Sequence, residues 1–439
     1  MAKRKNILML LSFSALCFGA NGTLLVSFSP LIGILCVLAA NTLPLLIGKR
    51  YIRPRLRFLI HGSACLKIFL AAALLSIPIQ TVIGFHYLPT DPSLWLTGLL
   101  ICIGVLTLVF WNGIISLYCT SRQLGLKLRI IGALCGMIPI VNLLVLFRML
   151  KVVNKEIQFE VSKADLNFSR KKDRICATKY PILLVHGVFF RDNRYFNYWG
   201  RIPNELSQNG CKIHYGNHPS AASVDECAEF LANRIRQITK ETGCEKVNII
   251  AHSKGGLDCR HAIAYHNAAP YVASLTTINT PHRGCKFADY LLEKIPIETQ
   301  QQVAEVYNRT LRKMGEADAD FMAAVGDLTS SQCLEQDNAM PLPQGIYTQS
   351  VGSKLNRASG GRFPLNFTYH LVRHFDGGND GLVGEESFRW GEHYTFLETT
   401  SPQGISHGDM IDLNRMDLPD FDVREFYVQL VADLKNRGL

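Results

Sequence analysis

The chain has 439 residues and a formal net charge of +10, and 48% of its residues are hydrophobic. Up to Arg174, twenty Lys and Arg stand against five Asp and Glu, whereas the remainder carries twenty-six against thirty-one. The positive charge therefore belongs to the N-terminal part, where it lies between long apolar runs. This pattern argues against a nucleic-acid-binding protein and is typical of charges that flank membrane segments.

Residues 1–150 are predicted to form an all-α transmembrane region of four or five helices. A span needs about 20 apolar residues, so residues 7–47 fit a hairpin of two spans, and residues 64–86 and 94–119 fit one each. Residues 130–147 are a fifth candidate, which Gly and Pro interrupt. Several such segments in series indicate a multi-pass membrane protein.

The positive-inside rule gives the orientation of these segments. Basic residues gather at Lys3–Lys5, Lys49–Arg57 and Arg122–Arg129, and these three stretches would be cytoplasmic. Four spans then leave the rest of the chain in the cytoplasm, whereas a fifth would place it outside. The basic linker at residues 151–175 and seven cysteines in the C-terminal half, an odd number, favour the cytoplasmic side. We expect an integral protein of a bacterial plasma membrane.

Residues 176–439 alternate between apolar runs and helical patterns, which predicts an α/β domain with a mostly parallel sheet. The apolar run at residues 247–251 ends in HSKGG, where Ser253 has Ala251 and Gly255 two positions away on either side. A sharp strand-to-helix turn requires small residues at this spacing, because larger side chains would collide. Ser253 is therefore predicted to be the nucleophile of an α/β-hydrolase fold.

A serine nucleophile needs a histidine base and a carboxylate that orients it, in the chain order serine, acid, histidine. Asp380 lies in a glycine-rich turn before an apolar stretch and is the predicted acid, with Asp376 as the local alternative. His407 follows the acid, as the order requires, and is the predicted base. His393 is its competitor.

The oxyanion that forms during acyl transfer needs two backbone N–H donors. One comes from the residue after the nucleophile, which here is Lys254, and the other from a loop after an earlier strand. The apolar run at residues 180–185 leads into His186, Gly187 and Val188. We expect the N–H groups of Val188 and Lys254 to be the donors, with Gly187 allowing close approach to the substrate.

Five motifs in this order resemble the bacterial triacylglycerol lipases of the α/β-hydrolase superfamily. They are the strand and loop at 181–188, KVNIIAHSKGGL at 246–257, TPHRG at 280–284, NDGLV at 379–383 and H-x-D at 407–409. The resemblance covers about residues 176–435 and implies the same triad and the same two oxyanion donors. It also implies that a helical insertion at about residues 285–345 forms a lid.

The chain departs from the family pattern at two places. The family usually has glutamine after the nucleophile, and the ammonium group of Lys254 could favour anionic substrates. The family also carries a calcium ion near the histidine loop, for which Asp409 matches one ligand while the second aspartate has no counterpart. Asp409 is thus only half of a calcium site, and no other cofactor is implied.

The sequence predicts a membrane-embedded lipase or esterase that cleaves lipid acyl esters through an acyl-enzyme on Ser253. Membrane lipids would be both its substrate and its environment, and no protein partner can be inferred. One alternative is an acyltransferase that uses the same acyl-enzyme. Another is a transporter or sensor with a vestigial hydrolase domain, which the few ionisable residues within the spans disfavour.

Overall fold

The computed structural model describes residues 2–25, 29–48, 53–136, 138, 140–188, 197–313 and 320–439. The chain forms two compact units, Met1–Phe168 and Ser169–Leu439. Each unit has its own core, and each is described by itself.

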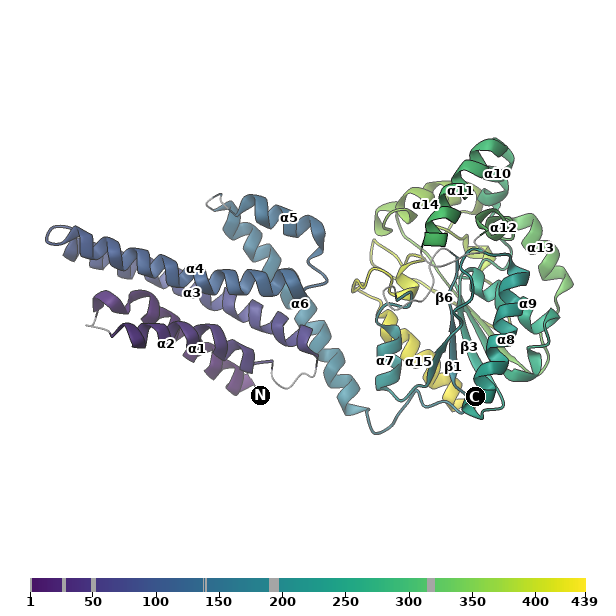
Figure 1. Cartoon of the computed structure of the whole chain (residues 1–439), viewed down its shortest axis with the longest axis horizontal. Helices are drawn as coiled ribbons and strands as arrows, with labels where there is room; N and C mark the ends of the chain where they lie inside the picture. The colour runs from purple at the N-terminus through teal and green to yellow at the C-terminus, as the bar shows by residue number, and fades with distance from the viewer. Residues whose placement is uncertain are drawn as a thin grey trace. The chain divides into compact units, whose positions relative to one another are not determined.

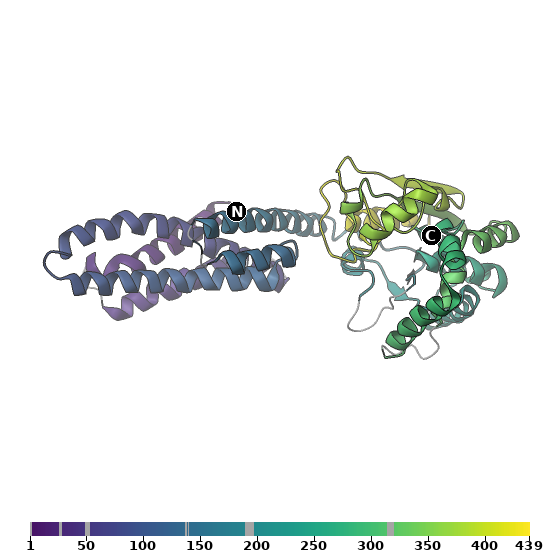
Figure 2. The same ribbon diagram turned by 90° about the horizontal axis from the view of Figure 1, so that it is seen from above.

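The N-terminal unit is a bundle of long helices (Figures 1 and 2). The helices are α1 (Ala2–Leu25), α2 (Pro30–Thr42), α3 (Pro54–Tyr87), α4 (Pro92–Thr120), α5 (Gly125–Cys135) and α6 (Val141–Ser169), and the 3-10 turn η1 (Leu43–Leu46) follows α2. Two helices of the described residues, α3 and α4, are long and apolar enough to cross a membrane. Their outer faces are apolar, as Leu74 and Phe85 of α3 show with exposed fractions of 69% and 79%.

Two boundaries differ from those expected from the sequence. Residues 130–147, the candidate fifth span, do not form one helix, because α5 ends at Cys135 and α6 begins only at Val141. Gly136 and Pro139, both poor helix formers, stand in the interval. The expected linker at 151–175 is helical as far as Ser169, because the helix-forming residues of α6 continue past the apolar stretch.

The C-terminal unit is built on a six-stranded sheet in which every neighbouring pair of strands is parallel. The strands are β1 (Ile182–Val185), β2 (Ile213–Tyr215), β3 (Val247–His252), β4 (Val272–Ile278), β5 (Tyr347–Ser353) and β6 (His393–Leu397), in the order β2-β1-β3-β4-β5-β6. Strands β1, β3 and β4 are buried along their whole length, which explains why apolar residues make up most of their sequences.

Helices cover both faces of this sheet (Figure 1). One face packs against α7 (Ile202–Gln208) and α15 (Val423–Asn436), and the other against α8 (Val224–Thr242) and α9 (Lys254–Tyr265). The insertion between β4 and β5 contains α10 (Lys286–Lys294), α11 (Ile297–Lys313), α12 (Phe321–Gly326) and α13 (Ser330–Ala339). A further helix, α14 (Leu365–Asp376), lies between β5 and β6. This three-layer arrangement is an α/β-hydrolase fold with a parallel sheet.

Candidate active site

Ser253 occupies a strained turn between β3 and α9. Its φ of 56° and ψ of −134° lie where L residues rarely occur, and such strain is concentrated at functional sites. The next residues must be small: a Cβ on Gly255 would lie 2.3 Å from the carbonyl oxygen of His186, and one on Gly256 would lie 2.2 Å from Thr280 Oγ1. The glycines of the HSKGG sequence therefore allow the turn that presents Ser253.

His407 and Asp380 form a closely bonded pair. The distance from His407 Nδ1 to Asp380 Oδ2 is 2.6 Å, and the backbone N–H of His407 donates to the Asp380 carbonyl at 2.9 Å. Asp380 is fully buried, and its Oδ1 accepts the N–H groups of Leu382 and Val383 at 2.9 and 2.8 Å. Asn279 Nδ2 donates to Oδ2 at 2.6 Å. These bonds fix the position of the carboxylate and the ring orientation of His407.

A hydrogen-bond chain joins the loop after β1, the serine turn and the histidine loop. The N–H of Gly187 donates to the hydroxyl oxygen of Tyr198 at 3.0 Å, and this hydroxyl lies 2.7 Å from His252 Nδ1. His252 Nε2 lies 3.2 Å from the carbonyl oxygen of His407, which can only accept. Nε2 therefore carries the proton, and Nδ1 accepts from Tyr198. Burial, followed by the charge of His407, lowers the pKa of His252 well below its usual value.

The two expected oxyanion donors belong to the residue after Ser253 and to the loop after β1. Lys254 is the first residue of α9, directly after the serine. Val188 is buried and follows Gly187, where an added Cβ would lie 2.7 Å from Ser253 Cβ. The loop after β1 thus approaches the serine closely because residue 187 is glycine.

The side chain of Lys254 points into the domain. Its Nζ donates to Asp258 Oδ1 at 2.6 Å and lies 3.5 Å from Cys227 Sγ, and the residue is 2% exposed. Burial acts to lower the pKa of Lys254, but the charges of Asp258 and Cys227 raise it overall, so the ammonium group persists. The expectation that this charge would favour anionic substrates is wrong, because Asp258 neutralises it inside the core.

The alternatives to the acid and the base have other surroundings. Asp376 pairs with Lys286 at 3.2 Å, and burial raises the pKa of this carboxyl. His393 begins β6 with an exposed side chain, and its ring lies 5.4 Å from that of Tyr347. Neither side chain makes the contact that joins Asp380 to His407.

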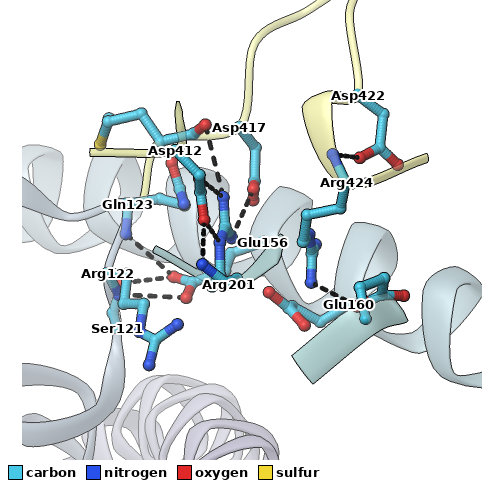
Figure 3. Close-up of polar contacts among 12 residues, drawn as sticks. Ser121, Arg122, Gln123, Glu156, Glu160, Arg201, Asp412, Asp417, Asp422 and Arg424 are labelled. Atoms are coloured by element: carbon cyan, nitrogen blue, oxygen red, sulfur yellow. Dashed lines mark hydrogen bonds and ion pairs between the residues drawn. The ribbon is translucent and has the colours of Figure 1, made fainter. Parts of the chain in front are cut away.

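An arginine that the sequence analysis did not single out holds the segment after His407. Arg201, at the start of α7, donates from Nε and Nη2 to the two carboxylate oxygens of Asp412 at 2.8 Å each. Its backbone N–H also donates to Asp412 at 2.7 Å, and Nη1 donates to Asp417 at 2.8 Å (Figure 3). A Cβ on Gly200 would lie 2.3 Å from the Asp412 carbonyl oxygen, so glycine is needed beside the arginine.

The residues near Asp409 do not fit a calcium ion. One oxygen of its carboxylate accepts the N–H and the hydroxyl of Ser406 at 2.9 and 2.7 Å. Burial raises the pKa of Asp409, an effect that Ser406 and Arg362 partly offset. Among the described residues, the clusters of three metal-ligating side chains do not include Asp409. Calcium takes six to eight oxygen ligands, and the neighbouring carboxylates of Asp412 and Asp417 are already bonded to Arg201.

Comparisons with known proteins agree with this fold. A family model described as the alpha/beta hydrolase fold matches residues 180–375. A triacylglycerol lipase of Pseudarthrobacter phenanthrenivorans is 34% identical over 181 residues, covering 38% of this chain and 56% of the relative. A triacylglycerol lipase of Burkholderia plantarii is also 34% identical over 181 residues, covering 38% of this chain and 50% of the relative.

Solved structures are also similar to part of the chain. The mature lipase BlEst2 of Bacillus licheniformis is 23% identical, with a TM-score of 0.43, and the match covers 58% of this chain and 92% of that one. The chain spans about half the length of the curated relatives it matches. Its C-terminal unit has the α/β-hydrolase fold, and the chain is similar in sequence to triacylglycerol lipases.

Proposed function

We propose that this chain is a membrane-embedded serine hydrolase that cleaves the carboxylic esters of lipids. The 2.6 Å contact between His407 Nδ1 and Asp380 Oδ2 carries the proposal, since it occurs in the unit that holds Ser253 on a strained strand-to-helix turn. An imidazole oriented by a buried carboxylate is the arrangement that activates a serine hydroxyl. The similarity to triacylglycerol lipases supports esters as substrates.

In the proposed reaction, the Ser253 hydroxyl attacks the ester carbonyl and His407 Nε2 accepts its proton. Asp380 keeps the Nδ1 proton in place and stabilises the imidazolium that forms. The N–H groups of Val188 and Lys254 bind the developing oxyanion. His407 then protonates the leaving alcohol, and water, activated by the same imidazole, hydrolyses the acyl-enzyme to release the carboxylic acid.

Exposed aromatic side chains near the acid and base loops support a lipid substrate. A Cβ on Gly381 would lie 2.9 Å from Leu365 Cβ, and one on Gly408 would lie 3.7 Å from Leu365 Cδ1, so Leu365 lies beside both loops. The nearby Phe363 and Phe367 are 82% and 78% exposed. Large apolar side chains exposed beside a catalytic site are typical of a surface that receives apolar ligands. We propose that these two rings, which we call the aromatic rim, contact the acyl chains.

The N-terminal unit supports the membrane part of the proposal. We propose that α1, α2 with η1, α3 and α4 cross the bilayer as four spans. Of the helices that the structure describes, α3 and α4 meet the length and apolarity that a span requires, and Pro30–Leu46 is apolar but shorter. The expected location is the plasma membrane of a bacterium, with lipids as environment and substrate.

Hydrolysis of nitrophenyl esters of increasing chain length by the purified full chain tests the catalytic proposal. Replacing Ser253→Ala should lower kcat by at least about 1,000-fold, since the nucleophile is lost. The exposed Ser207→Ala is the matched control and should leave kcat unchanged. Equal activity of Ser253→Ala and the parent chain would refute the proposal. Product analysis with an added alcohol would separate hydrolysis from acyl transfer.

The role of the aromatic rim is tested by Phe367→Ser. We expect hydrolysis of long-chain emulsified esters to fall about tenfold or more while that of short-chain soluble esters is retained, because the ring would contact only the distal acyl chain. Phe230→Ser, on α8, is the control and should alter neither activity. An equal loss on short and long esters would contradict acyl-chain binding by Phe367.

A further inference from the structure

The chain forms a helical hairpin between α4 and the C-terminal unit, which we call the catalytic unit because of the function proposed for it. The first arm is α5 (Gly125–Cys135), and the second is the first part of α6, from Val141 to Leu150. At the turn, the N–H of Ile138 donates to the Cys135 carbonyl at 3.1 Å, and that of Asn142 donates to the Ile138 carbonyl at 3.0 Å. We infer that this hairpin enters one leaflet of the membrane and returns to the face from which it came.

Neither arm is long enough to cross a bilayer. Eleven residues of helix reach about 17 Å and ten reach about 15 Å, whereas the hydrocarbon core is about 30 Å thick. Beyond Leu150, the helix α6 carries Lys151, Lys155 and Glu156, so its apolar part ends there. The hairpin therefore reaches roughly the middle of the bilayer.

The base of the hairpin is bonded to one end of the bundle. Glu156 of α6 accepts the hydroxyl of Ser121 at 2.6 Å and the N–H of Arg122 at 3.0 Å, both in the loop that precedes α5. It also pairs with Arg55, close to the start of α3, at 2.6 Å. Asn154 Oδ1 accepts the Ser63 hydroxyl of α3 at 3.0 Å. The start of α5 and the part of α6 around Glu156 thus both lie at the end of the bundle where α3 begins.

The arms pack closely on α4 and on each other. The Tyr118 hydroxyl donates to the Arg129 carbonyl at 3.0 Å, and a Cβ on Gly132 would lie 2.5 Å from that hydroxyl oxygen and 3.0 Å from Met149 Sδ. In Figure 1 the hairpin lies along the part of α4 nearer to where α6 leaves the bundle, and it does not reach the loop between α3 and α4. The hairpin is therefore a packed part of the bundle.

The other face of the hairpin is apolar and exposed, which identifies its partner as lipid. Leu126, Leu134 and Ile140 are each 73% exposed, and Leu144 and Phe147 are 68% and 69% exposed. The stretch from residue 130 to 147 contains no charged side chain. Soluble proteins rarely expose so continuous an apolar surface, whereas acyl chains would cover it at no cost in hydration.

The charged residues that flank the hairpin in the sequence give its orientation. Arg122, Lys127 and Arg129 precede or begin the first arm, and Arg148 and Lys151 end the second. The opposite end of the bundle, at residues 88–93, carries no Lys or Arg. By the positive-inside rule the hairpin enters from the cytoplasmic face. Because it returns to that face, the catalytic unit is cytoplasmic, a conclusion that rests on the proposed membrane embedding.

Cysteine labelling of the full chain in sealed vesicles tests this topology. The variants Thr90→Cys, Ile138→Cys and Ser169→Cys mark the α3–α4 loop, the hairpin turn and the end of α6. Each variant is treated with a membrane-impermeant maleimide in right-side-out and in inverted vesicles. The parent chain is treated in the same way, and its labelling, which comes from the native cysteines, is subtracted. We expect Thr90→Cys to react only in right-side-out vesicles and Ser169→Cys only in inverted ones. Ile138→Cys should react in neither until detergent is added.

Two results would overturn the inference. Reaction of Ser169→Cys from the same side as Thr90→Cys would show that the segment crosses the membrane. Rapid reaction of Ile138→Cys in intact inverted vesicles would show that the turn lies in water. A chain that alkaline carbonate removes from membranes would instead refute the proposed embedding, and ester hydrolysis is scored separately, so the failures are distinguishable.

Discussion

The bonds from Arg201 to Asp412 and Asp417 form a clamp, and removing this arginine clamp should weaken both the fold and the candidate catalytic site. Arg201 and Asp412 have side chains 7% and 0% exposed and make three charge-assisted bonds of 2.7 to 2.8 Å, and Arg201 also binds Asp417. Removing one partner of a buried ion pair costs about 3 to 5 kcal/mol, because the other charge remains buried and unpaired. We therefore expect Arg201→Met to lower the unfolding free energy of the catalytic unit by that amount. Asp412 lies five residues after His407, so the change should also displace the base.

The assay compares Arg201→Met with Arg309→Met, since Arg309 makes an exposed pair with Glu305 on α11. An exposed pair of this kind contributes at most about 0.5 kcal/mol. At about 2 to 4 °C per kcal/mol for a unit of this size, Arg201→Met should lower the midpoint of thermal unfolding by about 6 to 20 °C. Below that midpoint kcat should fall while KM for short-chain esters changes little. Similar small shifts in both variants would refute the clamp.

Three further predictions concern other groups near the site. Tyr198→Phe removes the hydroxyl that bonds to the Gly187 N–H and to His252 Nδ1. Because both buried groups would lose this partner, the variant should destabilise the unit by about 1 to 3 kcal/mol. Chemical denaturation measures the unfolding free energy, and an unchanged value would contradict these bonds. Gly187→Ala places a Cβ 2.7 Å from Ser253 Cβ and should lower kcat/KM about 100-fold or more, whereas Gly326→Ala, with open space around it, should not. Burial keeps the pKa of His282 well below 6.5, so unfolding takes up a proton at lower pH and stability falls as pH decreases through 6.5. His282→Gln should reduce that slope by up to about 1.4 kcal/mol per pH unit in unfolding measured between about pH 7 and 5; an unchanged slope would contradict the prediction.

The sequence predicts most of the catalytic unit because steric rules restrict its turns to few residues. Ser253 could be located because only small neighbours fit the strand-to-helix turn, and the structure shows the close contacts of Gly255 and Gly256 that impose this rule. The contact between Asp380 and His407 joins residues 27 positions apart, with Asp380 in the loop between α14 and β6 and His407 after β6. Local sterics thus define the serine turn, and chain order guided the choice of acid and base.

What the sequence does not predict depends on side-chain direction and on long-range pairing. The ammonium group of Lys254 was expected to affect substrate choice, yet it pairs with Asp258, and the i,i+4 spacing of the two on a helix was the available signal. Arg201 and Asp412 are 211 positions apart and have no motif that announces their contact. For residues 130–147, hydropathy measures apolarity but not direction, and only Gly136 and Pro139 indicated a turn.

The proposed membrane embedding and the aromatic rim would together explain how a modest binding surface acts on lipids. An enzyme held at a bilayer meets its substrate at a high effective concentration, so a few apolar contacts suffice for capture. Phe363 and Phe367 can supply these contacts beside the acid and base loops. Transition-state stabilisation can then come from the Asp380–His407 pair and the backbone donors rather than from tight binding of the ground state. On this reasoning, release of the chain from lipid should raise KM for long-chain esters far more than it lowers kcat.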